Sequence, residues 1–131
     1  MDYGDQTTQN EAVILPGAKV VQSTRLLEAV TGNIVYTGFG FTPSSLIVFS
    51  AQSGTERGNW GMTDGVSQTE IYNSTTSFLY ASGSRLLTLD NAGSDQQLGT
   101  FGSFNSDGFD IDWVKGGTGS GTIFLKFIAY K

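Results

Sequence analysis

The sequence predicts an all-β domain, an antiparallel, jelly-roll-like β-sandwich of about eight to ten short strands. Three observations predict it. Residues 45–50 and 122–130 are apolar on both faces, which is typical of strands in the middle of a sheet. Residues 109–114 alternate apolar and polar side chains, as a strand with one face in the core does. The chain holds 18 Gly but only 2 Pro, which indicates many tight turns.

The first predicted element is a polar N-terminal arm, residues 1–12, which precedes a sandwich domain of residues 13–131. Apart from Tyr3, the arm has almost no apolar side chain before Ala12. It is either a frayed terminus or an arm that becomes ordered on a neighbouring surface, and in the second case Tyr3 contacts the partner. The core pattern begins with residues 12–15 and turns at Pro16-Gly17.

The rest of the chain alternates short apolar runs with Gly-rich turns. Residues 25–30 fit either one helical turn or a strand, and a strand is favoured because the run is short and Thr31-Gly32 ends it. Asp64-Gly65 between two strand-like runs predicts a hairpin. The expected strand segments are 19–23, 25–30, 33–37, 45–50, 59–63, 67–72, 77–80, 85–89, 97–101, 109–114 and 122–130.

The composition excludes several classes of function. A chain of 131 residues forms one domain. It has no Cys and no His, which excludes disulfides, thiolate or imidazole metal sites and a Ser-His-Asp triad, and no cofactor is expected. A net charge of −5 with scattered bases argues against nucleic-acid binding. No apolar run is long enough for a membrane span, and the acidic N-terminus does not resemble a signal peptide.

Three carboxylates, Asp107, Asp110 and Asp112, are the nearest approach to a metal-binding motif. Oxygen-rich loops of this kind can hold calcium, but the ligand spacing of an EF-hand is missing. Asp107 belongs to an Asn-Ser-Asp-Gly turn, and Asp110 and Asp112 point away from the apolar face of their strand. We therefore expect a structural turn followed by a solvated strand face.

Carboxylate-only catalysis is the remaining enzymatic hypothesis. A glycosidase needs two carboxylates that face each other across a cleft, and a domain of this size has little room for one. The candidates are Glu56, Asp64, Glu70 and Asp90. Nothing in their spacing brings two of them together, so this activity is disfavoured.

The strongest candidate for contact with a partner is the Gly-rich stretch around Arg57, Asn59 and Trp60. An exposed Trp flanked by Arg and Asn can stack on a sugar ring or anchor a protein contact. The alternative is that Trp60 packs into the core at the start of a strand, and this placement is favoured because Trp is usually well buried.

The order of these segments resembles a small β-sandwich module found in virion proteins of tailed bacteriophages and their prophages. The resemblance lies in residues 32–49, in Asn-Trp-Gly-Met-Thr-Asp-Gly at 59–65 and in Ser-Asp-Gly-Phe-Asp-Ile-Asp-Trp at 106–113. A Gly-Thr hairpin and a hydrophobic last strand complete it, so that it spans residues 32–131.

The resemblance implies a non-enzymatic virion structural protein, because such modules share no catalytic residues. They are similar to capsid decoration (cement) proteins or to the receptor-facing parts of tail fibres. The first implies a protein made in the host cytoplasm that sits on the outer capsid surface as a dimer or trimer and bridges major capsid protein subunits or another virion protein. A charged fraction of only 15% likewise indicates covered surface. The alternative is a tail-fibre or receptor-binding module that recognises a host surface carbohydrate.

Overall fold

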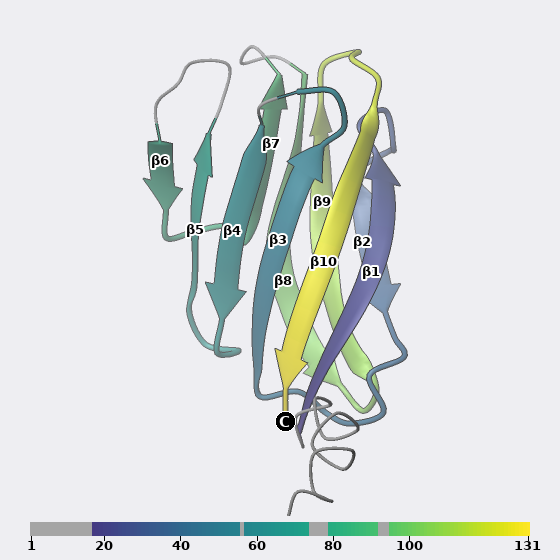
Figure 1. Cartoon of the computed structure of the whole chain (residues 1–131), viewed down its shortest axis with the longest axis vertical. Helices are drawn as coiled ribbons and strands as arrows, with labels where there is room; N and C mark the ends of the chain where they lie inside the picture. The colour runs from purple at the N-terminus through teal and green to yellow at the C-terminus, as the bar shows by residue number, and fades with distance from the viewer. Residues whose placement is uncertain (1–16, 56, 74–78, 92–94) are drawn as a thin grey trace, which may run out of the picture.

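The described part of the computed structural model consists of residues 17–55, 57–73, 79–91 and 95–131, and it contains two antiparallel sheets packed face to face (Figure 1). The predicted β-sandwich is therefore confirmed. The strands are β1 Ala18–Leu26, β2 Gly32–Tyr36, β3 Ser45–Gln52, β4 Gly58–Thr63, β5 Gln68–Asn73, β6 Leu79–Ser82, β7 Leu87–Asn91, β8 Asp95–Asn105, β9 Gly108–Gly116 and β10 Thr122–Tyr130.

The two sheets differ in size and in how the chain crosses between them. The six-stranded sheet has the order β1-β10-β3-β4-β5-β6, and the four-stranded sheet has the order β2-β9-β8-β7. The first and last strands interleave, since β10 lies between β1 and β3 and β9 pairs with β2. This interleaving is the jelly-roll-like part of the fold, while β3 to β6 follow one another as a meander.

The two segments that are apolar on both faces, β3 and β10, are neighbours in the middle of the six-stranded sheet. Their inward side chains, such as Leu46 and Phe127, are completely buried. Their outward side chains are not covered in the same way, because Phe49 and Phe124 remain 37% and 54% exposed. The central positions are confirmed, but one of the two apolar faces lies on the surface of the molecule.

The core between the sheets is rich in aromatic rings. Phe109, Ile111 and Trp113 of β9 all point into it, which confirms the predicted alternation of that strand. Tyr36 packs on Phe109 with ring centroids 5.4 Å apart, and its hydroxyl oxygen accepts a hydrogen bond from Nε1 of Trp113 at 3.1 Å. The guanidinium of Arg25 lies 4.6 Å from the centre of the Trp113 ring, so a charged side chain of an edge strand is also stabilised inside.

Two local predictions have different outcomes. The hairpin at Asp64-Gly65 is confirmed, since Gly65 has a φ of 88° and β4 and β5 pair on either side. The strand expected over residues 25–30 is wrong beyond Leu26. The chain turns there because the N–H of Ala29 bonds back to the carbonyl of Leu26 at 3.0 Å and the side chain of Leu27 enters the core.

The predicted N-terminal arm, residues 1–12, and Tyr3 within it lie outside the described residues. No helix in the described part of the chain is long and apolar enough to cross a membrane.

Candidate docking surface

The cluster predicted around Trp60 lies at the start of β4 rather than in a loop, and its residues point in opposite directions. Asn59 faces the interior and is 3% exposed. Its Nδ2 donates to the carbonyl of Leu86 at 3.0 Å, and its Oδ1 accepts the backbone N–H of Thr88 at 3.1 Å. Asn59 therefore ties the two sheets together and is not available to a partner. Trp60, the next residue, points outward and is 65% exposed, so the expectation of a core Trp is wrong.

Of the other two predicted contact residues, only Arg57 lies in the part of the chain that the structure describes, and it is half-buried. Arg57 precedes β4, where its carbonyl accepts the N–H of Gln52 at 3.2 Å. The Nε of Arg57 is buried and has no hydrogen-bond partner among the described residues. Tyr3 lies outside the described residues. Trp60 is thus the one predicted contact residue that the structure places on an open surface.

The surroundings of Trp60 form three rows that run across the six-stranded sheet on its outer side. The central row is set by the strand register and reads Gln22, Lys126, Phe49, Trp60, Ile71 and Ala81. The rows on either side are Val20, Ile128, Ile47, Met62 and Thr69, and Thr24, Phe124, Ala51 and Gly58. We call these residues the apolar face. Lys126 is the only charged side chain in the three rows.

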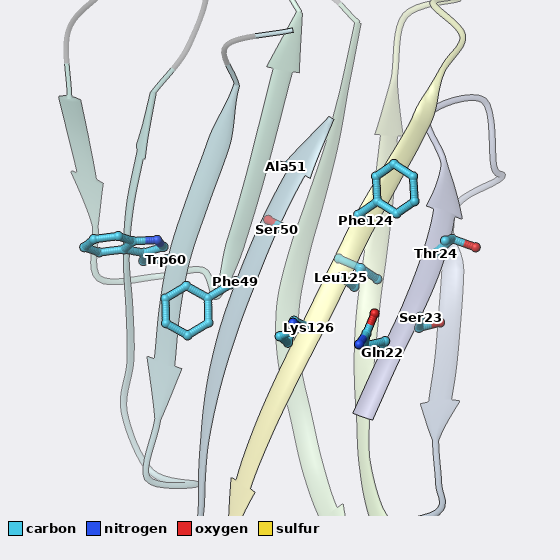
Figure 2. Close-up of a pocket in the computed structure, with 10 residues that line it drawn as sticks. All are labelled: Gln22, Ser23, Thr24, Phe49, Ser50, Ala51, Trp60, Phe124, Leu125 and Lys126. Atoms are coloured by element: carbon cyan, nitrogen blue, oxygen red, sulfur yellow. The ribbon is translucent and has the colours of Figure 1, made fainter. Parts of the chain in front are cut away.

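Three aromatic rings dominate the apolar face. In Figure 2 the rings of Phe49 and Phe124 lie with their flat sides toward the viewer, and Trp60 is seen nearly edge-on. The rings of Phe49 and Trp60 meet edge to face, with centroids 5.8 Å apart and planes at 77°. This arrangement is a preferred one for aromatic pairs and fixes both rings against the sheet.

A hollow of about 780 Å³ lies among these rings on the apolar face (Figure 2). Phe49, Trp60 and Phe124 line it, and Lys126 projects between them. Gln22 and Thr24 of β1 add polar groups at one side. The hollow can accept apolar side chains of another protein, and its chemistry also suits the flat face of a sugar ring.

The outer side of the four-stranded sheet has a different chemistry. Here Nδ2 of Asn33 donates to Asp110 and to Asp112, each at 2.7 Å, and the hydroxyl of Ser103 donates to Asp110 at 2.7 Å. Partial burial raises the pKa of Asp110, but the hydrogen bonds from Ser103 and Asn33 outweigh it and hold this pKa below its usual value. We call this surface, with Val35 and Val114 beside the two carboxylates, the acidic face.

The predicted structural role of the three aspartates fits this geometry. Asp107 lies in the turn before β9, where its carboxylate accepts the N–H groups of Gly38 and Gly40 at 2.9 and 2.6 Å. These bonds hold the pKa of Asp107 below its usual value and fix the loop between β2 and β3. Among the described residues, no group of three or more His, Cys, Asp or Glu is placed to hold a metal ion.

Of the carboxylates considered for glycoside hydrolysis, the two whose side chains the structure describes, Asp64 and Glu70, do not form a facing pair. Glu70 points into the core, where its Oε1 accepts bonds from Thr88 Oγ1 at 2.6 Å and from Arg85 Nε at 3.3 Å. Burial raises the pKa of Glu70 in spite of these bonds. Asp64 lies in the exposed β4–β5 turn. Glu56 and the side chain of Asp90 are outside the described residues.

Sequence reasoning missed most of the apolar face. It singled out Trp60, but not Phe49, Met62, Ile71 or Phe124, which the strand register brings beside it. The signal was present in the two-sided apolar pattern of β3 and β10, from which we predicted only that these strands lie in the middle of a sheet. The apolar face is therefore a candidate docking surface. No protein-family model matches the chain, and neither a curated protein nor a solved structure is similar to it.

Proposed function

We propose that this chain is a non-enzymatic structural protein of a bacteriophage virion, a capsid decoration protein that bridges and stabilises shell subunits. The sequence resemblance to virion modules supports the context. The single observation that carries the proposal is the apolar face, whose three aromatic rings and lone cation suit protein contact. In this role the protein is made in the host cytoplasm and acts on the outer capsid surface, with the major capsid protein or another virion protein as its partner.

The energetic case rests on water-exposed apolar surface. Covering 100 Å² of such surface contributes about 2.5 kcal/mol before the cost of association. A monomeric protein rarely leaves several neighbouring large apolar side chains uncovered. Trp60, Met62 and Phe124 are each more than half exposed, and no acidic side chain interrupts their three rows. Assembly into a particle therefore stabilises this protein by covering apolar surface, and no catalysed reaction is needed.

Cosedimentation with purified, undecorated shells of the parent phage tests the proposal. We expect the wild-type protein to pellet with shells and to raise the temperature at which they disassemble. Trp60→Glu places a charge in the central row and should weaken binding at least tenfold. The matched control is Val35→Glu, an exposed position on the acidic face that should bind as the wild type does. Absence of wild-type binding to shells would contradict the proposal.

A second candidate function is a tail-fibre or receptor-binding module that recognises a host surface carbohydrate. The observation that favours it is the aromatic hollow, where Gln22, Thr24 and Lys126 provide hydrogen-bonding groups beside exposed rings. A glycan array separates the two candidates. Selective glycan binding that Trp60→Ala abolishes, together with no affinity for shells, would replace the decoration hypothesis by this one.

A further inference from the structure

We propose that the apolar face is the interface of a symmetric dimer, in which the apolar faces of two copies of this chain pack against each other. The inference rests on the proposed function of this surface in assembly and names its occupant. In such a dimer the same residues contribute from both copies, so a single self-complementary patch is enough to close the assembly.

The size of the apolar face fits this interface. Six strands at a spacing of about 4.8 Å make the sheet about 29 Å wide. Three rows two residues apart, with their margins, extend about 20–30 Å along the strands. The product is about 600–900 Å² per copy, and a stable interface covers about 800 Å² on each partner. One second copy therefore covers the face completely.

Lys126 determines how two faces can meet. The midline of the sheet runs between β3 and β4, with Phe49 on one side and Trp60 on the other, and β10 lies off this line. A two-fold axis along the midline places β10 opposite β5 of the other copy. The two Lys126 side chains are then about 14 Å apart, three strand spacings, which exceeds the screening length of about 8 Å at physiological salt.

The same axis gives the other central residues apolar neighbours. Trp60 meets Phe49 of the second copy, and the aliphatic stem of Lys126 lies along Ile71 of the second copy while its ammonium group reaches the rim. An axis across the strands would instead set the two Lys126 side chains against each other in the central row. The position of this one cation therefore selects the arrangement with aligned strands.

Stacking of the apolar face on the acidic face of the next copy is the competing geometry. It would cover carboxylates that are already satisfied by Asn33 and Ser103, and it would remove Asp110 and Asp112 from water. It would also leave one free face at each end and continue into a filament. The symmetric pair avoids both costs and leaves two acidic faces pointing in opposite directions.

A symmetric dimer also explains how so small a domain can bridge shell subunits. The two apolar faces then cover each other, so the dimer contacts the shell through its remaining surfaces, each of which it presents twice. Two linked contacts can exceed the affinity of one by about 10²–10⁴-fold, so Trp60→Glu weakens shell binding by removing the second contact.

The test uses the full chain without shells. Sedimentation velocity over a concentration series should show the wild type at twice its 14.0 kDa mass. Trp60→Glu and Trp60→Lys should each raise the dimer dissociation constant at least tenfold. An equimolar mixture of these two variants should recover at least tenfold in affinity, because the two opposite charges then lie diagonally across the axis, with a lateral offset of about 4.8 Å, one strand spacing. Val35→Glu should dimerise as the wild type does.

A second set of measurements tests whether the variants remain folded and whether something other than a second copy covers the apolar face. Trp113 is buried, so a red shift of tryptophan emission on dilution should come from Trp60, and the variants should keep the wild-type circular dichroism spectrum. A wild type that stays monomeric to about 100 μM, or a Glu/Lys mixture that recovers nothing, overturns the dimer. If only a chain lacking residues 1–16 dimerises, the N-terminal segment occupies the face and the proposal is wrong. Shell binding by a monomer would leave the proposed function standing without this inference.

Discussion

The outer faces of the two sheets enclose the same core, but the exposed side chains on the two faces make different kinds of contact. On the acidic face, Asp110 and Asp112 are joined through Asn33, and Ser103 completes the network. These exposed groups bond to one another. On the apolar face, Phe49 and Trp60 contact each other, and 37% and 65% of their respective surfaces face solvent.

This difference shows that the inward and the outward residues of one strand determine different properties of the protein. β9 and β10 have equally buried inward positions, from Phe109 to Trp113 and from Ile123 to Ala129. Their outward positions diverge, with aspartates in β9 but Phe124 and Ile128 in β10. The inward set specifies the fold, and the outward set decides whether the sheet faces water or another protein.

We expect the largest difference in the free energy of unfolding between substitutions at two adjacent residues of β4. A Cβ at Gly61 would lie 1.9 Å from the carbonyl oxygen of Leu86, a backbone atom that cannot move freely. We expect Gly61→Ala to reduce the free energy of unfolding by about 3 kcal/mol. Met62→Ala, on the apolar face, should change it by less than about 0.5 kcal/mol. Urea titration at low protein concentration checks both, and equal effects would contradict the assignment of faces.

The fold was largely predictable because its signals are local. The alternation in residues 109–114, the Asp64-Gly65 hairpin and the central positions of β3 and β10 follow from side-chain period and turn chemistry. The end of β1 was not predictable in the same way. The turn that follows β1 is held by Gln97, whose Nε2 donates to the carbonyls of Leu27 and Ala29, and a partner so far along the chain leaves no signal in the local sequence.

The second expected effect concerns the network on the acidic face. Asp110→Ala removes the bonds to Asn33 and Ser103 and should cost about 1–2 kcal/mol, because the bonds are charge-assisted but partly in contact with water. Asp112→Ala removes one bond from Asn33 and should cost about half as much. Thermal unfolding of both variants beside the wild type is the measurement. A larger loss for Asp112→Ala would show that the network is centred elsewhere.

The candidate site was less predictable than the fold, for a physical reason. An apolar outward residue in a central strand has the same local sequence whether a third layer covers it or not. Trp60 was expected in the core on the average behaviour of Trp, and Asn59 was a candidate for contact with a partner. Side chains alternate along the strand, and both residues are placed opposite to these expectations. Asn59 bonds across to Leu86 and Thr88 in the interior, and Trp60 therefore points outward.

The third prediction compares the titration of Asp107, in a turn, with that of Glu70, which is buried between the sheets. Hydrogen bonds lower the pKa of Asp107 in the folded state, so its stabilising effect is present above its unfolded pKa of about 3.9 and is lost as the pH falls further. The pKa of Glu70 is raised by burial, so its effect has the opposite sign. Its stabilising contribution is complete below about pH 4.3 and is lost as the pH rises through its folded pKa.

Stability should therefore rise on mild acidification from neutral pH and fall again below about pH 4. Urea midpoints between pH 3 and pH 8 measure the profile. Glu70→Gln should flatten the rise, and Asp107→Asn should reduce the fall. A wild-type midpoint that only decreases from pH 7 downward would show that Glu70 ionises in the fold as it does in the unfolded chain.

We expect the smallest effect when the one charged side chain of the apolar face is replaced. Lys126→Met should leave the free energy of unfolding within about 0.5 kcal/mol of the wild type, because the side chain is exposed and forms none of the ion pairs found among the described residues. It should tighten self-association a few-fold and make it insensitive to salt, since two like charges about 14 Å apart are screened but not absent at low ionic strength. Lys115→Met on β9 is the matched control and should change neither property. Sedimentation at low and at physiological salt distinguishes the cases. Weaker self-association of Lys126→Met would mean that the ammonium group finds an acidic partner, and the apolar face would then meet a surface unlike itself.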